Sequence, residues 1–396
     1  MLKKRIIQSA KPYFPEEDIE SISKDVRTLL AGGRLLGIGG VFTQRFEKAY
    51  SSYIGTRYAV ATSSGTSALV GALRALGVKK GQEVIVPTNT FLASPNSVIM
   101  AGGKPILADI NDKSLCLDVD DAAKRITDNT VGIMVVHIHG LVCPEIEKLI
   151  ELCRDKGLFL IEDAAHAPGA LFKDKKAGSF ADAGCFSFFP TKIITSGEGG
   201  MVCTNNESMA EKIKILRYDG IGTDNLHVDF GDNWHITEMS SILGIYQLNR
   251  IEEFIKRRNE IALRYRESIR KVDGLTTIEV PSQFRCSFYK FPVMVDEGID
   301  AVPLMQELKS KYGIETGQVY YPPCHLQPIY KKMFGYEEGM LPVSERVLKR
   351  MVCLPMHVQL TDSDVDYVLT NLKLSLKNFR LRKTSNRTLS LEESAR

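Results

Sequence analysis

The sequence predicts an α/β protein with a large domain built on a mostly parallel sheet and a smaller α/β domain after it. From about residue 57, short apolar runs alternate with helical patterns. The runs are apolar throughout, as expected for strands buried on both faces under covering helices. The 396 residues are 44% hydrophobic and 25% charged, which is typical of two or three soluble globular domains.

The first elements are expected to be two helices with a loop between them. Pro15 followed by acidic residues predicts the start of a helix over 15–30. A glycine-rich loop follows at 32–40, and an amphipathic helix is predicted over 42–53.

The alternating region is expected to supply the strands of the large domain and the helices that cover them. We predict strands at 58–61, 83–87, 105–109, 131–136 and 158–161, and helices at 67–76 and 145–156. One long helix is predicted over 239–258 and closes the large domain, which we assign to residues 1–258.

The smaller domain is assigned to residues 259–376. A strand-like run at 288–295 and a helix at 303–312, with Pro303 at its first position, support this assignment. Residues 377–396 are polar and rich in Ser, Arg and Glu, so they are predicted to be a disordered tail.

Charge and cysteine content restrict the partners and the compartment. The net charge is +3, from 51 basic and 48 acidic residues that are interspersed, so nucleic acid is not an expected partner. No stretch is apolar enough to cross a bilayer, and membrane association is not expected. The eight cysteines lack metal-site and redox spacings, which favours reduced thiols in the cytoplasm and no metal.

Lys192 gives the strongest chemical signal. It follows an apolar run that contains Ser187, and the glycine-rich turn 196–200 comes after it. Burial lowers the pKa of a lysine and frees the amine to attack an aldehyde, as when lysine holds pyridoxal phosphate (PLP) as a Schiff base. Ser187 is then a candidate to bind the phosphate of the same cofactor. The alternative for Lys192 is an exposed lysine at a strand end.

Asp163 ends an apolar run and is followed by His166. Ligands bind at the carboxyl ends of parallel strands, where a carboxylate can keep the pyridine nitrogen of PLP protonated. A helix cap or a metal ligand is the alternative, although further metal ligands at suitable spacing are lacking. His166 could donate a hydrogen bond to the phenolic oxygen of the cofactor or be a buried structural residue.

Ser64, Gly65 and Thr66 form a turn between a predicted strand and a predicted helix. Free N–H groups and the helix dipole favour a phosphate at such a position, while a simple helix cap is the alternative. Phe91 follows the strand at 83–87 and could stack on a planar ring or pack in the core.

Two further segments carry candidate residues. Asn233, ahead of a predicted helix, could cap that helix or reach a phosphate. His325 lies in a proline-rich loop of the smaller domain, where it could face the cleft between domains or hold a surface turn.

The order and spacing of these motifs over residues 12–375 resemble the DegT/DnrJ/StrS family of PLP-dependent sugar aminotransferases. The motifs that carry the resemblance are the loop around Gly37 and the runs 64–69, 81–88, 162–167, 187–192, 197–200 and 353–357. The resemblance implies the fold type I architecture of PLP-dependent aminotransferases.

The resemblance also implies roles for individual residues. Lys192 is the Schiff-base lysine and general acid/base, Asp163 pairs with the pyridine nitrogen, and His166 lies near the ring oxygen. Phe91 is the stacking aromatic. The implied phosphate-binding residues are Ser64, Gly65, Thr66 and Ser187.

Asn233 resembles a residue that reaches the cofactor phosphate of a partner subunit, which implies a homodimer with shared active sites. His325 resembles a substrate-side residue. His235 stands where the family usually has an arginine, and this departure indicates a different substrate or different interface packing.

The expected activity is transfer of an amino group from L-glutamate, with release of 2-oxoglutarate, to a keto group of a nucleotide-linked sugar. Such a product would serve surface polysaccharide, glycan or secondary-metabolite biosynthesis. A PLP-dependent sugar dehydratase is one alternative, although related dehydratases have histidine in place of Lys192. A PLP enzyme acting on amino acids, which would usually need an arginine clamp, and a regulatory or sensory homologue without turnover are the others.

Overall fold

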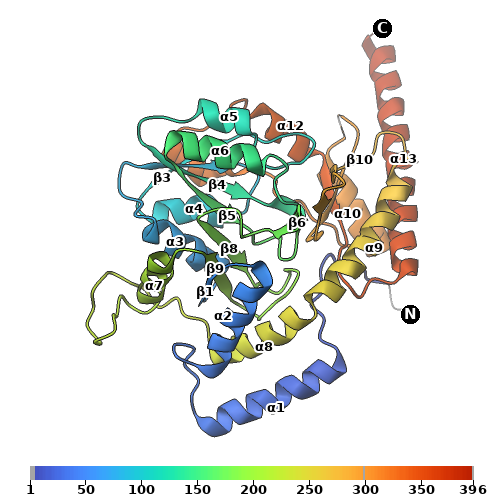
Figure 1. Cartoon of the computed structure of the whole chain (residues 1–396). Coiled ribbons are helices and arrows are strands. Elements are labelled where there is room, and N and C mark those ends of the chain that lie inside the picture. The colour runs from blue at the N-terminus through green and yellow to red at the C-terminus, as the bar shows by residue number, and fades with distance from the viewer. Residues whose placement is uncertain (1–4, 298, 395–396) are drawn as a thin grey trace.

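A seven-stranded sheet forms the centre of the large domain in the computed structural model, which describes residues 5–297 and 299–394 (Figure 1). The strand order is β1-β9-β8-β5-β4-β2-β3. Neighbours from β8 to β3 are parallel, and β9 lies antiparallel between β8 and β1. The predicted mostly parallel sheet is therefore confirmed. Its strands are β1 (Tyr58–Thr62), β2 (Glu83–Pro87), β3 (Lys104–Ala108), β4 (Thr130–Val136), β5 (Phe159–Asp163), β8 (Ala183–Ser187) and β9 (Gly200–Thr204).

Helices cover both faces of this sheet because its strands bury side chains on both sides. On one face, Val84 and Ile161 belong to a hydrophobic cluster with α3, α4 and α7. On the other face, Ile85 and Leu160 pack in the main core with α2 and α6. The helices of this domain are α1 (Glu16–Gly32), α2 (Val41–Ile54), α3 (Gly65–Ala75), α4 (Ala93–Met100), α5 (Val119–Lys124), η1 (Ile138–Gly140), α6 (Ile146–Lys156) and α7 (Glu207–Leu216).

The helix predicted over 239–258 is two helices, α8 (Glu238–Asn249) and α9 (Ile251–Ile269). Arg250 separates them, and its guanidinium pairs with Glu17 and Asp18 of α1. Because α9 continues to Ile269, the predicted domain boundary at residue 258 lies inside a helix.

The smaller domain contains a three-stranded antiparallel sheet, β10-β12-β13, beside α9, α10 and α13 (Figure 1). Its first helix begins at Ala301 after the cap Asp300, not at Pro303 as predicted, because the Asp300 side chain accepts a hydrogen bond from the N–H of Val302. Its elements are β10 (Thr276–Thr277), β12 (Phe291–Met294), α10 (Ala301–Tyr312), η2 (Cys324–Leu326), α11 (Pro328–Phe334), α12 (Pro342–Lys349), β13 (Met351–Leu354) and α13 (Asp362–Ser394).

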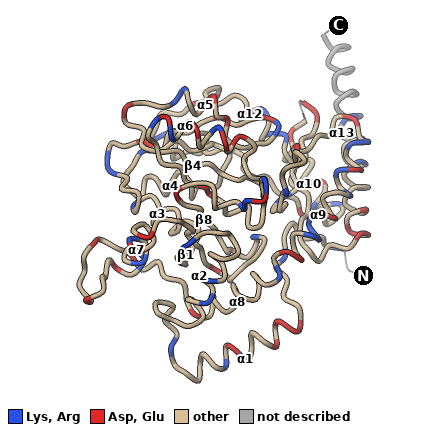
Figure 2. The backbone as a smooth tube through the Cα atoms, viewed as in Figure 1, with Lys and Arg blue, Asp and Glu red and all other residues tan. Residues whose placement is uncertain are grey.

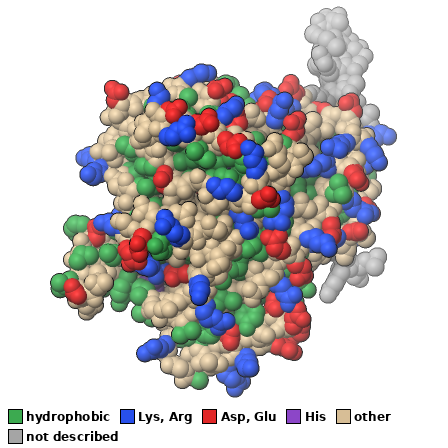
Figure 3. Space-filling model, viewed as in Figure 1, with side chains coloured by type: hydrophobic (Ala, Val, Ile, Leu, Met, Phe, Trp, Pro, Cys, Tyr) green, Lys and Arg blue, Asp and Glu red, His purple; other side chains and the backbone are tan. Residues whose placement is uncertain are grey.

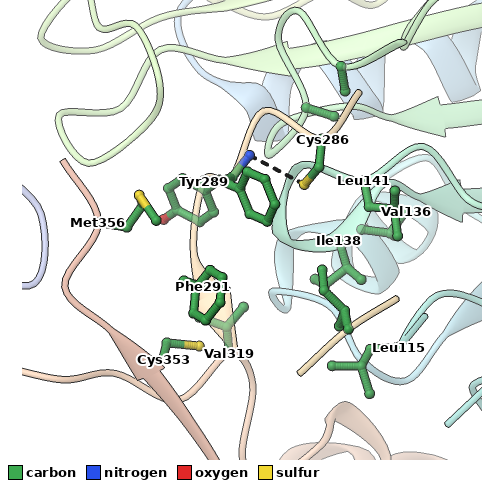
Figure 4. Close-up of a cluster of buried hydrophobic side chains, with 14 of the residues drawn as sticks. Leu115, Val136, Ile138, Leu141, Cys286, Tyr289, Phe291, Val319, Cys353 and Met356 are labelled. Carbon is green, nitrogen blue, oxygen red and sulfur yellow. Dashed lines mark hydrogen bonds between the residues drawn. The ribbon is translucent and has the colours of Figure 1, made fainter. Parts of the chain in front are cut away.

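The two domains share one hydrophobic core. Figure 4 shows Val136 and Ile138 of the large domain and Phe291, Val319 and Cys353 of the smaller one within the same cluster of buried hydrophobic side chains. A small third sheet also joins the domains, because β11 (Phe284–Arg285) pairs with β6 (Leu171–Phe172), which pairs with β7 (Lys175–Lys176). The cavity described below is therefore framed by both domains.

The backbone of α13 is helical to Ser394, where the sequence predicted a disordered tail from residue 377. Side chains beyond Arg380 lie outside the described residues. Lys and Arg are interspersed with Asp and Glu along the chain, as Figure 2 shows. Within the described ranges, no helix is both long and apolar enough to span a membrane.

Candidate active site

A cavity of about 450 Å³ opens where β5 and β8 end and α3 begins. The fold brings eight of the sequence-predicted site residues to its wall: Ser64, Gly65, Thr66, Phe91, Asp163, His166, Ser187 and Lys192. The first and last of them, Ser64 and Lys192, are more than a hundred residues apart in the sequence. Each of the eight ends a strand of the sheet, follows one, or begins the helix after β1. The other three candidates, Asn233, His235 and His325, do not line the cavity.

Lys192 is the cation of the cavity. It follows β8, and its backbone N–H donates to the carbonyl of Phe189, which turns the chain back toward the sheet. Its Nζ lies 4.7 Å from the ring centre of Tyr289. Burial lowers the pKa of Lys192 to about 8, against the opposing attraction of Asp163 and with a further lowering by the nearby cation Lys290. A neutral amine is therefore accessible near neutral pH.

Asp163 is the carboxylate of the cavity, at the end of β5, and is only 6% exposed. Its Oδ2 accepts a hydrogen bond from Ser94 Oγ at 2.6 Å. Its Oδ1 accepts one from the N–H of Ala165 at 3.1 Å. Because each oxygen has a donor, the plane of the carboxylate is fixed in the cavity wall.

The start of α3 provides donors for an anion. Ser64 caps the helix by accepting from the N–H of Ser67, so the cap predicted as an alternative is present. In the described part of the chain, the N–H groups of Gly65 and Thr66 have no protein acceptor. A Cβ on Gly65 would come within 2.8 Å of Ser187 Cβ, so only glycine lets the backbone approach Ser187 this closely. Ser64 is thus both a cap and part of the cavity wall.

His166 and two tyrosines form an aromatic group in the cavity wall. The His166 ring lies 4.1 Å from that of Tyr289, and its Nε2 is 3.1 Å from the hydroxyl of Tyr320. Burial, with a contribution from Lys192, lowers the pKa of His166 well below its usual value, so the ring is neutral. The buried Nδ1 of His166 has no partner among the described residues.

Tyr289 and Tyr320 are cavity residues that the sequence did not reveal. Tyr289 precedes β12, and its hydroxyl lies 3.1 Å from Thr191 Oγ1, next to Lys192 in the chain. Tyr320 comes from the segment before η2. Both belong to the smaller domain and carry no motif, so only the folded arrangement identifies them.

Phe91 lies at the mouth of the cavity. It is 59% exposed, and its ring centre is 5.7 Å from that of Tyr320. The core position considered for Phe91 is excluded by this exposure, whereas a position from which it can stack on a ligand is present.

The substrate-side position expected for His325 needs correction, because His325 is fully buried. Its Nδ1 is 2.8 Å from Thr88 Oγ1 and its Nε2 is 2.9 Å from Glu345 Oε1. Both ring nitrogens are therefore engaged, and the ring anchors the smaller domain to the end of β2. Within the proline-rich loop, residues 323–325 are buried, and Cys324 donates its N–H to the carbonyl of Thr88.

Asn233 and His235 lie outside the cavity of their own chain. Asn233 is exposed and forms an isolated bridge with Tyr218. His235 is half-buried, and its ring packs edge-on against Tyr218 at 6.2 Å. Neither caps α8, because Thr237 accepts from the N–H of Ser240 in that role.

The cavity suits PLP on three observations. Gly65 forms a close backbone cradle with free N–H groups, which matches a phosphate. Lys192 offers an amine of lowered pKa, which matches an aldehyde. Asp163 and the unpartnered Nδ1 of His166 offer an acceptor and a polar atom for a heteroaromatic ring. Within the described ranges, no group of His, Cys, Asp or Glu converges as a metal site requires.

Comparison with known proteins agrees with this arrangement. The chain is 33% identical over 386 residues to the spore coat polysaccharide biosynthesis protein SpsC of Bacillus subtilis. This match covers 93% of the chain and 97% of SpsC. The chain is also 35% identical over 338 residues to GDP-perosamine synthase of Caulobacter vibrioides. This match covers 84% of the chain and 90% of that protein.

The solved structures give the same result. Spr1654 from Streptococcus pneumoniae in its PLP form matches with a TM-score of 0.87 and 27% identity, over 94% of this chain and 99% of that one. The model of the DegT/DnrJ/EryC1/StrS aminotransferase family matches residues 16–373. The chain therefore belongs to the DegT/DnrJ/EryC1/StrS aminotransferase family and is a PLP-dependent aminotransferase with a type I fold.

Proposed function

We propose that this enzyme transfers an amino group from L-glutamate to the keto group of a nucleotide-linked sugar. The observation that carries the proposal is Lys192, with its lowered pKa, in one cavity with Asp163 and the cradle at Gly65. The similarity to GDP-perosamine synthase supports a nucleotide-linked sugar as acceptor. The similarity to SpsC supports a role in polysaccharide synthesis.

Lys192 and Asp163 have separate roles in the proposed reaction. Bound PLP supplies an aldehyde for the donor's amino group and a ring that takes up the electron pair left at the donor's α-carbon. Lys192 Nζ removes the proton from that α-carbon and delivers it to C4′, for which a pKa of about 8 is well suited. The Asp163 carboxylate would accept a hydrogen bond from the ring nitrogen and so keep that nitrogen protonated. After 2-oxoglutarate leaves, Lys192 carries out the reverse proton movements on the keto sugar.

Recognition of an α-carboxylate usually uses a bidentate arginine. No arginine lines the cavity in the part of the chain that the structure describes. The L-glutamate donor and the amino-acid alternative both carry an α-carboxylate, so the acceptor test below separates them. The presence of Lys192 argues against the sugar dehydratase alternative.

The spectrum of the purified holoenzyme tests the donor. We expect L-glutamate to remove the visible absorption band and 2-oxoglutarate to restore it. Nucleotide-linked keto sugars are then added to enzyme treated with glutamate and freed of 2-oxoglutarate, and return of the band identifies the acceptor. A band that ignores glutamate would refute the donor assignment. A band that no amino donor bleaches would favour the regulatory alternative.

A homodimer with shared active sites is supported by the segment between α7 and α8. This segment projects from the large domain and carries three exposed apolar side chains, Leu226, Val228 and Phe230, of which Phe230 is 90% exposed (Figures 1 and 3). Such exposed apolar groups favour a protein interface. Asn233, at the base of the segment, does not reach its own cavity, as expected if it serves the partner's cofactor.

Light scattering tests this assembly. We expect the mass of a dimer, and we expect Phe230→Asp to weaken both association and turnover because the shared sites would separate. A fully active monomer would contradict the shared sites while leaving the transamination proposal intact.

A further inference from the structure

Two buried hydroxyl groups form a hydrogen-bonded chain that ends at the Asp163 carboxylate. Ser94 Oγ is 2.6 Å from Asp163 Oδ2 and 2.6 Å from Thr90 Oγ1. Ser94 has no exposed surface and Thr90 has 2%. These are short contacts of the kind made by O–H groups that donate to a carboxylate.

The direction of the hydrogen bonds follows from counting protons. An ionised carboxylate only accepts, so the single hydroxyl proton of Ser94 is donated to Asp163. The Ser94 oxygen must then accept the proton of Thr90 in the second contact. The chain therefore runs from Thr90 through Ser94 to Asp163, and each bond polarises the next.

The surrounding structure holds this chain in place. Ser94 lies in the first turn of α4, so the helix fixes its backbone. Just before Thr90, Asn89 donates to the carbonyl of Leu115 and accepts from the N–H of Tyr320. Both domains thus fix the position of the two hydroxyls.

We propose that Ser94 and Thr90 are positioning residues that keep the Asp163 carboxylate oriented and weakly basic, so that the shared proton stays on the cofactor's ring nitrogen. A carboxylate that already accepts a strong hydrogen bond has less affinity for a further proton. A proton retained on the ring nitrogen makes the ring a stronger electron acceptor. This inference depends on the cofactor and not on the sugar or donor proposed above.

The test places the proton directly. Native enzyme and the variants Ser94→Ala, Ser94→Thr and Thr90→Val are loaded with PLP labelled with ¹⁵N in the ring, and the ¹⁵N resonance is measured. We expect Ser94→Ala to move the resonance toward that of unprotonated pyridine, Thr90→Val to move it less, and Ser94→Thr to restore the native position. The rate at which an active amino donor bleaches the visible band should fall about tenfold or more in Ser94→Ala, since hydrogen bonds to charged groups have effects of this size.

Ser97→Ala is the matched control. Ser97 is as buried as Ser94 and lies on the same helix, but its hydroxyl bonds the Ser94 carbonyl and not Asp163. We expect it to keep the native resonance even if its thermal unfolding shifts. A native resonance in Ser94→Ala, or an equal displacement in Ser97→Ala, would overturn the proposal. If Ser94→Ala does not fold, Thr90→Val takes its place. A displaced resonance in Thr90→Val would then support the proposal, and a native resonance would overturn it.

Discussion

Replacing Glu162 by glutamine should strongly destabilise the large domain. Glu162 lies in the buried part of β5, next to Asp163 at the strand end, and its side chain has no exposed surface. Successive side chains of a strand point to opposite faces, so Glu162 lies behind the cavity wall and not in it. Its carboxylate accepts four hydrogen bonds, from His137 Nε2 at 2.8 Å and from the N–H groups of Gly178 at 2.6 Å, Phe180 at 2.7 Å and Ala181 at 2.9 Å.

The size of the effect follows from the two oxygens, each of which accepts two of these bonds. A glutamine amide keeps one oxygen and turns its NH₂ group toward the other pair of donors. His137 cannot adjust by moving its proton, because its Nδ1 already accepts from the N–H of Cys143. Two hydrogen bonds to a charged group, each contributing about 1.5–3 kcal/mol, are therefore lost. The expected loss of about 3–6 kcal/mol is a large part of the ~5–15 kcal/mol by which proteins are stable.

Urea unfolding of the holoenzyme, followed by far-ultraviolet circular dichroism, measures this loss. Glu147→Gln is the matched control, because Glu147 is exposed and, among the residues that the structure describes, forms an ion pair only with Lys173. It should change stability by less than ~1 kcal/mol. If Glu162→Gln also lost less than ~1 kcal/mol, the assignment of four donors to one carboxylate would be wrong.

Three further predictions concern the cavity. Lys192→Ala should abolish turnover in a steady-state assay, and any turnover above background would contradict its role. In cofactor-free enzyme, Lys192 should react with an amine-labelling reagent increasingly as pH rises, with a midpoint near pH 8, because the amine is neutral above its lowered pKa. Lys290→Met should raise this midpoint by removing a neighbouring cation, and peptide mass spectrometry at each pH follows the labelling. Gly65→Ala should weaken PLP binding about tenfold or more in equilibrium dialysis, because its Cβ would crowd Ser187, whereas Gly32→Ala meets no atom within 4 Å and should bind normally.

The sheet could be predicted from the sequence because its signals are local. Apolar runs such as 83–87 and 131–136 identify buried strands without any knowledge of their neighbours. The break at Arg250 could not be predicted, since no glycine or proline interrupts the apolar pattern there. Its contacts with Glu17 and Asp18 come from more than two hundred residues away.

The same distinction applies to the site. Asp163 and Lys192 follow strand ends, so their meeting at one edge of the sheet was predictable. Tyr289 and Tyr320 reach the cavity from the other domain, and no pattern in the sequence marks that approach. His325 was placed from its proline-rich loop and from the family resemblance, whereas its buried contacts with Thr88 and Glu345 depend on how the domains pack.

The unbroken helix α9 determines how substrates can enter. Its first half packs on the large domain, where Ile255 approaches Gly169, and its second half packs on the smaller one, where Tyr265 lies 5.1 Å from Phe291. Rotation of one domain against the other would bend this helix, which strains its hydrogen bonds. A hinge motion between the domains is therefore not expected. At the mouth of the cavity the exposed side chain of Phe91 can rotate, and rotations of exposed side chains take picoseconds to nanoseconds. We therefore expect the frame of the cavity to stay nearly the same while ligands bind and leave.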